Sequence, residues 1–258
     1  MNPTLSDLKA LAYSAGEILL SGFGKRHQID YKGAIDLVTE VDHQSEAYLL
    51  DEIRRRFPGH RINTEESGEL SGQGHSLWYI DPLDGTVNFA HGVPIFSVSL
   101  AYAENGQLKL AAVYQPALDE CFCAERGGGA TLNGQPIHVS SSINLDRSLL
   151  VTGFAYDIRT NPRTNLAQHN RFALISQGVR RLGSAAMDLC YVAAGRFDGY
   201  WELAVGPYDI AAGSLIAEEA GARVSNIYGE LSYLQPPCSI LAANPNIHPQ
   251  MLQVLSQM

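Results

Sequence analysis

Two carboxylates stand close together in the segment WYIDPLDGTVNF, which covers residues 78–89. Asp81 ends an apolar run that is typical of a buried strand, and Asp84 comes three residues later. A buried pair of carboxylates repels itself and costs free energy unless a proton or a cation neutralises it. The segment therefore indicates a shared proton, a bound cation or, more plainly, a helix N-cap with a solvated neighbour.

The residues after the two acids favour the cation. Gly85 and Thr86 stand where the chain can turn from a strand into a helix, and Pro82 is expected to end the strand pairing. The backbone N–H groups of residues 85 and 86 would then point out of a helix N-terminus, which suits an anion. Carboxylates beside such amides are explained together if a divalent cation bridges them to a phosphate. Oxygen ligands favour Mg²⁺.

Other acids lie at the boundaries of predicted elements. Glu65 and Glu66 follow a strand-like stretch, and Asp209 follows Pro207 at a predicted helix start. Each of these acids, taken alone, is also explained as a helix cap or a surface residue. Their common position at element ends raises the probability that they act together with Asp81 in one site.

The motifs that carry these acids resemble those of the inositol monophosphatase family, in the Mg²⁺-dependent, lithium-sensitive sugar phosphatase superfamily. The resemblance covers nearly the whole chain, and its motifs occur in the family's order. It implies a layered αβαβα sandwich, the sugar-phosphatase fold. The matching segments are DLVTEVD (36–42), TEES (64–67), DPLDGTVNF (81–89), TLNGQPIHVS (131–140), RRLGSAAMDLCYVAAGRFDGYWE (180–202) and PYDIAAGSLIAEEAG (207–221).

The resemblance implies two Mg²⁺ ions, with a weaker third ion near Glu65. The first ion would be held by Glu65, Asp81 and the backbone carbonyl of Leu83. The second would be held by Asp81, Asp84 and Asp209. Cations of this kind explain how a protein with a formal net charge of -9 binds a phosphate.

The resemblance also assigns catalytic and substrate-binding roles. Thr86 and Asp42 would pair and orient the attacking water, with Glu65 nearby, and Lys32 would mark a loop over the third ion. The amides of Gly85 and Thr86 would bind phosphate. The polyol would be bound by Gly183, Ser184, Ala185, Glu202 and Asp209.

The function implied is hydrolysis of inositol 1-phosphate, or of a similar small polyol or sugar monophosphate, by a water that the ions activate. Histidinol-phosphate phosphatase, 3′(2′),5′-bisphosphate nucleotidase and fructose-1,6-bisphosphatase are the alternatives within the superfamily. A regulatory binding protein is an alternative of another class, because some bacterial relatives act with the transcription machinery. The family also implies a homodimer.

The elements that must position these residues divide the chain into two kinds of pattern. Residues 1–145 predict an antiparallel sheet with two flanking helices, and residues 146–258 predict an α/β arrangement; together they form one layered unit over 1–258. Helices are expected at 1–24, 36–57, 170–177, 185–195 and 209–221, and the second of these is expected to begin at Thr39 or Asp36. Strands are expected at 60–66, 76–81, 148–154, 179–184, 196–203 and 238–244, and hairpins at 96–116 and 120–139.

Composition excludes several classes of partner. The net charge of -9 argues against nucleic acid or an anionic membrane as the main partner. No segment is long and apolar enough to span a membrane. The four cysteines lack zinc-site spacing and are expected to be reduced, which suits a cytoplasmic protein.

Overall fold

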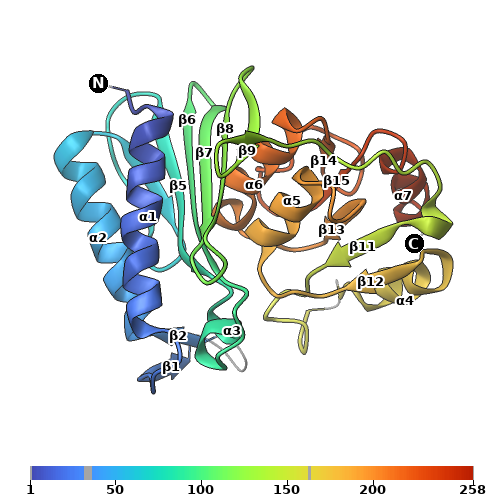
Figure 1. The fold of residues 1–258 in the computed structure, drawn as a ribbon, viewed down its shortest axis with the longest axis horizontal. Coiled ribbons are helices and arrows are strands. Elements are labelled where there is room, and N and C mark those ends of the chain that lie inside the picture. Colours follow the sequence, from blue (N-terminus) through green and yellow to red (C-terminus); the bar gives the residue numbers. More distant parts are fainter. Residues whose placement is uncertain (1, 32–36, 162–163, 258) are drawn as a thin grey trace.

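The computed structural model describes residues 2–31, 37–161 and 164–257, so that the predictions for Lys32 and Asp36 lie outside it. Its helices and strands form five layers, ordered helix, sheet, helix, sheet, helix (Figure 1). Three hydrophobic cores fill the spaces between the layers. The predicted αβαβα sandwich is confirmed.

The first layer consists of α1 (Leu5–Gly22) and α2 (Glu40–Arg56). Each helix begins with a capping box, in which an N-cap threonine and an aspartate three residues later bond to each other's backbone N–H. The pairs are Thr4 with Asp7 and Thr39 with Asp42. Of the two predicted starts of α2, Thr39 is the N-cap. Leu37–Thr39 form the strand β2, which pairs with β1 (Ile29–Tyr31).

The second layer is an eight-stranded sheet in the order β10-β9-β8-β7-β6-β5-β3-β4. It is antiparallel except between β3 and β5. Alternate residues of β6 face opposite layers: Val98 and Leu100 pack toward α1 and α2, and Ala101 and Ala103 toward α5 and α6. The strands are β3 (Arg61–Thr64), β4 (Gly68–Leu70), β5 (Ser76–Asp84), β6 (Ser97–Glu104), β7 (Gln107–Gln115), β8 (Glu120–Glu125), β9 (Gly129–Leu132) and β10 (Gln135–Pro136).

The middle layer contains α5 (Ala185–Ala193) and α6 (Pro207–Glu219), which lie between the two sheets (Figure 1). Both helices are apolar on nearly all sides, as a helix covered on both faces must be. Their first turns point toward the end of β5, where α3 (Thr86–Ala90) begins. This layer therefore carries residues of the second half of the chain to the acids of the first half.

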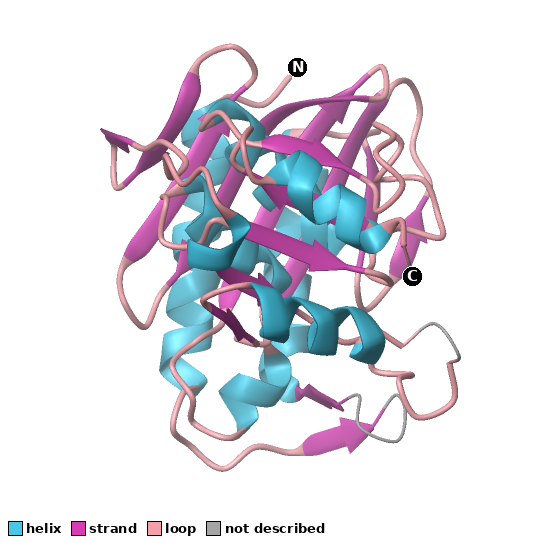
Figure 2. Ribbon diagram, turned by 90° about the vertical axis from the view of Figure 1, so that its right-hand side faces the viewer, coloured by secondary structure: helices cyan, strands magenta, loops and turns pink. Residues whose placement is uncertain are grey.

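The last two layers are a five-stranded sheet and the helices α4 (Leu166–Ile175) and α7 (His248–Leu255). Figure 2 looks onto this side of the molecule, where helices lie in front of strands. The sheet order is β12-β11-β13-β15-β14, and β11 runs parallel to β12 and β13. The strands are β11 (Leu149–Thr152), β12 (Gly178–Arg180), β13 (Gly199–Glu202), β14 (Arg223–Ser225) and β15 (Ile240–Ala243), preceded by the short 3₁₀ helix η1 (Leu145–Arg147).

The predicted elements agree with the structure in type and order, and their ends differ. The pattern did not predict β1, β2, β4, β14 or α7. All four cysteines are free and buried, as expected. Within the described ranges, no helix is both long and apolar enough to cross a membrane. The division of the unit at residue 145 stays a prediction.

Candidate active site

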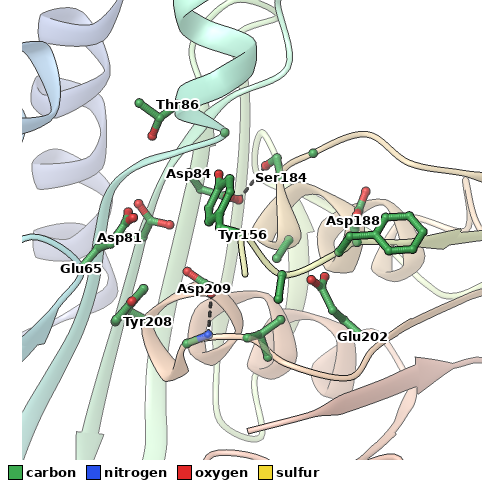
Figure 3. Close-up of a pocket in the computed structure, with 18 of the residues that line it drawn as sticks. Glu65, Asp81, Asp84, Thr86, Tyr156, Ser184, Asp188, Glu202, Tyr208 and Asp209 are labelled. Atoms are coloured by element: carbon green, nitrogen blue, oxygen red, sulfur yellow. Dashed lines mark hydrogen bonds between the residues drawn. The ribbon is translucent and has the colours of Figure 1, made fainter. Parts of the chain in front are cut away.

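A cavity of about 370 Å³ opens where elements of both halves of the chain end (Figure 3). Among the predicted site residues that the structure describes, Asp42 and Glu66 do not line it. The other predicted residues all do: Glu65, Asp81, Leu83, Asp84, Gly85, Thr86, Gly183, Ser184, Ala185, Glu202 and Asp209. The residues chosen from the sequence thus converge in space, while the role of each stays a prediction.

β5 brings two of the acids to the cavity through an irregularity at its carboxyl end. Asp81 pairs with Ser99 of β6 and Asp84 pairs with Ser97, and the register shifts between these pairs. The prediction that Pro82 ends the strand is therefore wrong. Pro82 lies in the shifted stretch, where its missing N–H interrupts no regular pairing. The shift allows two acids three residues apart to line the same cavity.

Gly85 turns the chain from β5 into α3. Its φ of +92° lies in the left-handed region, and a Cβ there would come within 2.9 Å of the carbonyl oxygen of Ile95. Both observations explain why glycine is needed at this turn. α3 has five residues, so its dipole is small. A phosphate at this point would depend on the individual amides of Gly85 and Thr86.

Asp42 reaches the cavity through Thr86. Its Oδ2 accepts hydrogen bonds from the backbone N–H and hydroxyl of Thr39, at 2.9 and 2.6 Å. Its Oδ1 accepts from the Thr86 hydroxyl at 3.0 Å, and that hydroxyl is also 3.0 Å from the carbonyl oxygen of Leu83. Burial raises the pKa of Asp42. Because the Thr86 proton is directed to acceptors in the protein, the lone pairs of Thr86 Oγ1 are available to a water.

Asp84 is held from the opposite side of the cavity. Its Oδ2 accepts from the hydroxyl of Ser184 at 2.6 Å and from the backbone N–H of Ala186 at 2.8 Å. Ser184 is also the N-cap of α5, where its hydroxyl accepts from Met187 N. Burial raises the pKa of Asp84 to about 6, although these hydrogen bonds oppose the rise. The start of α5 thus fixes the orientation of an acid that belongs to β5.

Glu65 follows β3 and is half-buried at the wall of the cavity. The residues on either side of it are anchored by Glu46 of α2, which is itself buried. Glu46 accepts from the Thr64 hydroxyl at 2.8 Å and from the N–H and hydroxyl of Ser67, at 3.0 and 2.8 Å. A single carboxylate on α2 therefore fixes both ends of the turn that carries Glu65 and Glu66.

Asp209 enters from the first turn of α6, where its Oδ2 accepts from Gly206 N at 2.6 Å. Figure 3 shows Asp209, Asp81 and Glu65 around the same side of the cavity. Burial raises the pKa of Asp81 well above its usual range, and the charges of Glu65, Asp84 and Asp209 raise it further. Four acids that disfavour one another's ionisation form an oxygen-only donor set, which fits a hard divalent cation.

The four acids do not form a complete set of metal ligands in this structure. In the described part of the chain, no three His, Cys, Asp or Glu side chains form a complete metal-binding group. Asp84 is drawn toward Ser184, and Asp209 toward Gly206. Mg²⁺ commonly takes few protein ligands and completes its shell with water and substrate oxygens. The donor set therefore fits such an ion with part of its shell supplied from outside the protein.

The other end of the cavity is also acidic. Glu202, at the end of β13, is buried, and its Oε2 accepts from the Tyr200 hydroxyl at 2.6 Å. Burial raises the pKa of Glu202 to about 7. Gly153 lies against this carboxylate, because a Cβ at Gly153 would overlap Glu202 Oε2. The space for the Glu202 side chain thus depends on a glycine that the sequence analysis did not select.

Further lining residues were not predicted from the sequence. The loop after β11 contributes Gly153, Tyr156 and Asp157, and α5 and the turn before it contribute Asp188 and Arg181. Two signals in the sequence point to them. Asp188 is a charged residue within the apolar stretch AAMDLCYVAAG, and the loop after β11 follows the carboxyl end of a parallel strand, where sites in α/β folds gather.

Comparison with known proteins identifies the same family that the motifs resemble. The family model described as "Inositol monophosphatase family" matches residues 2–258. An inositol-1-monophosphatase of Synechocystis sp. is 47% identical over 246 residues, covering 94% of this chain and 85% of that protein. The Nus factor SuhB of Escherichia coli is 40% identical over 255 residues, covering 98% and 95%.

A solved structure agrees with these matches. The inositol monophosphatase from Anabaena (Nostoc) sp. superimposes with a TM-score of 0.89 at 43% sequence identity, covering 98% of this chain and 95% of that one. The likeness thus extends over sequence and fold, and over both halves of the chain that form the cavity. On this evidence the chain belongs to the inositol monophosphatase family.

Proposed function

We propose that this protein is a Mg²⁺-dependent phosphomonoesterase that hydrolyses inositol 1-phosphate or a similar small polyol monophosphate to the alcohol and phosphate. One observation carries the proposal: Glu65, Asp81, Asp84 and Asp209, from three separate segments, surround one cavity beside the amides of Gly85 and Thr86. Family membership supports a phosphatase, and the choice of substrate is the further step that we propose.

The acids divide into two sets for two ions. Glu65, Asp81 and the carbonyl oxygen of Leu83 would hold one Mg²⁺, and Asp81, Asp84 and Asp209 the other; a weaker third ion near Glu65 is also proposed. Bound Mg²⁺ supplies positive charge to the phosphate and lowers the pKa of water. The carbonyl of Leu83 has two lone pairs, so it can accept from Thr86 and still face an ion.

The protein's own groups position the reactants. Thr86 and Asp42 orient the attacking water. The Thr86 hydroxyl donates a hydrogen bond to Asp42, and its oxygen accepts a hydrogen bond from the water. The raised pKa of Asp42 makes it a better acceptor for that network. The amides of Gly85 and Thr86 hold the phosphate, and Gly183, Ser184, Ala185, Glu202 and Asp209 hold the polyol. Such positioning is the main contribution of the protein when charge neutralisation comes from ions.

The proposal is tested with a substrate panel at fixed Mg²⁺. Inositol 1-phosphate is compared with histidinol phosphate, a nucleoside 3′,5′-bisphosphate and fructose 1,6-bisphosphate, with p-nitrophenyl phosphate as a reference. We expect the highest kcat/KM for inositol 1-phosphate. We also expect that EDTA abolishes this activity. Equal turnover with and without EDTA would reject the metal, and a higher kcat/KM for another member of the panel would reassign the substrate.

Asp84→Asn supplies the matched inactive variant. The change preserves shape and removes one charge from the second set of ligands, so turnover should be abolished while the fold remains. Ser184 and the Ala186 amide can still donate to the remaining amide oxygen. Unchanged kcat at saturating Mg²⁺ would show that Asp84 is not a ligand.

A second candidate function rests on the relatives named Nus factor, which are about as similar to this chain as the named phosphatases. We propose it as an additional role in which the fold binds a partner of the transcription machinery. A pull-down with Asp84→Asn separates the two roles, because binding of a partner does not require turnover. The homodimer and a cytoplasmic location stay predictions.

A further inference from the structure

Two hairpin turns of the eight-stranded sheet share the sequence Asn-Gly-Gln. Asn105 and Gly106 join β6 to β7, and Asn133 and Gly134 join β9 to β10. Both residues of each turn have a positive φ, as in a type I′ turn: +53° and +77° in the first, +49° and +79° in the second. All four residues are exposed. The two turns are therefore matched in sequence, in backbone conformation and in access to water.

The two asparagine side chains differ in their contacts. Asn133 Oδ1 accepts a hydrogen bond from the backbone N–H of Cys121 at 2.8 Å, and Asn133 Nδ2 donates to the carbonyl oxygen of Asp119 at 2.8 Å. The chain that leads into β8 thus holds this amide at both ends. Among the described residues, the Asn105 side chain makes no hydrogen bond, although its backbone N–H donates to the carbonyl oxygen of His75 at 3.0 Å. The Asn105 side chain can therefore rotate without losing a contact.

We propose that Asn105 is a site of spontaneous deamidation in the folded protein, and that its two hydrogen bonds protect Asn133 from the same reaction. The backbone nitrogen of the following glycine bonds to the side-chain carbon Cγ, and the bond from Cγ to the amide nitrogen breaks. The proton of the glycine N–H leaves with that nitrogen as ammonia, and a succinimide ring remains. Water, the only co-reactant, then opens the ring at either carbonyl and gives aspartate or isoaspartate.

The hydrogen bonds decide between the two turns because the asparagine side chain must rotate until Cγ meets the next backbone nitrogen. Glycine favours this attack at both turns, since no Cβ shields its nitrogen. At Asn133 the rotation breaks both hydrogen bonds of the side chain before any bond forms. Losing two hydrogen bonds together should make the reaction at Asn133 at least about tenfold slower than at Asn105.

The products change the β6–β7 hairpin in different ways. Aspartate adds one negative charge beside Glu104. In isoaspartate the main chain runs through the former side chain and is one carbon longer, so a two-residue turn no longer matches the register of its strands. That register places Ala103 opposite Leu108, and both side chains are buried in the central hydrophobic core. Isoaspartate at position 105 should therefore lower Tm, whereas aspartate should change it little.

The test follows the whole folded protein during incubation for days in mildly alkaline buffer. Proteolysis and mass spectrometry measure the gain of about 1 Da at each turn, and the same measurement is made on the chain unfolded in urea. In the folded protein, the gain at Asn105 should be at least about tenfold faster than the gain at Asn133. In urea the two rates should be similar. Asn105→Gln is the matched control and should remove the fast gain, because glutamine would have to close a larger ring.

Equal rates at the two turns of the folded protein would overturn the inference, because the hydrogen bonds of Asn133 would then give no protection. A difference that persists in urea would overturn it as well, since the cause would be local sequence and not tertiary contacts. Tm of the incubated proteins is the second measurement. It should fall for the native chain and stay constant for Asn105→Gln. An equal fall in both would show that it does not come from position 105, and would overturn the effect inferred for the hairpin.

Discussion

The pKa of Glu202 leads to a sharp prediction about stability. The group is 7% exposed, and burial raises its pKa from 4.5 to about 7. Between about pH 4.5 and pH 7, Glu202 therefore holds a proton in the folded protein but has lost it in the unfolded chain. Stability is therefore lost as the pH rises from about 4.5 to about 7, the reverse of the usual behaviour of a carboxylate. The ionised group should cost the metal-free protein roughly 3 kcal/mol at pH 8 and less than about 1 kcal/mol at pH 5.

Glu202→Gln removes the ionisation and preserves the shape, and the amide oxygen still accepts from Tyr200. A protein of this size gains roughly 2–4 °C in Tm per kcal/mol, so the variant should melt roughly 6–12 °C above the native chain at pH 8. At pH 5 the two should differ by less than about 4 °C. Thermal unfolding in EDTA, followed by circular dichroism, measures the difference.

The control for this experiment is Glu69→Gln, at an exposed acid on β4. It makes the same change in net charge and should leave Tm unaltered at both pH values. An equal Tm gain for Glu202→Gln at pH 5 and pH 8 would refute the reasoning, because the effect would then come from packing. A lower Tm at pH 8 would show that the ionised form is stabilised by the fold.

Three further changes have defined outcomes. Thr86→Ala should lower kcat at least tenfold, because the hydroxyl is proposed to orient the attacking water. The Mg²⁺ concentration that gives the half-maximal rate should change little. A variant that lost only Mg²⁺ affinity would contradict this role. Gly153→Ala should raise KM for a polyol phosphate more than for p-nitrophenyl phosphate, since the new Cβ displaces Glu202, and an equal effect on both would argue against that contact. Glu46→Gln should bind Mn²⁺ more weakly than the native chain does, as measured by calorimetry. A single amide oxygen cannot accept all three hydrogen bonds that hold the turn at Glu65. An affinity for Mn²⁺ equal to that of the native chain would rule out this anchoring role.

The hydrophobic pattern was sufficient to select the acids Glu65, Asp81, Asp84 and Asp209 because they stand at element ends, whereas the polyol-binding residues were selected only through the resemblance to the family. Asp81 and Asp84 follow an apolar run, and Asp209 follows a proline at the first turn of a helix. Such positions are visible in hydrophobic patterns. The register shift in the pairing of β5 with β6 could not be predicted from the hydrophobic pattern. Whether a strand continues past Pro82 depends on its partner β6, which supplies Ser97 for Asp84.

The residues that the sequence did not select depend on tertiary contacts. Nothing in a helical pattern distinguishes a face that packs on a core from one that borders a cavity, so Asp188 was included only as part of a helix. Gly153 is explained by the approach of Glu202, from a strand far along the chain. The strand β2 is three residues long and directly precedes α2, so periodicity merged the two.

The hydrogen bond between Ser184 and Asp84 joins residues 100 positions apart in the chain. Asp209 enters still later in the chain, on a helix that packs between the two sheets. During synthesis, Asp81 and Asp84 therefore lack Ser184 and Asp209 until most of the chain has left the ribosome. Contacts of such long range are slow to form because the intervening chain must be ordered first. A folding intermediate with only the eight-stranded sheet would expose two mutually repelling acids, and the ability to bind the proposed Mg²⁺ would appear as one of the last events of folding.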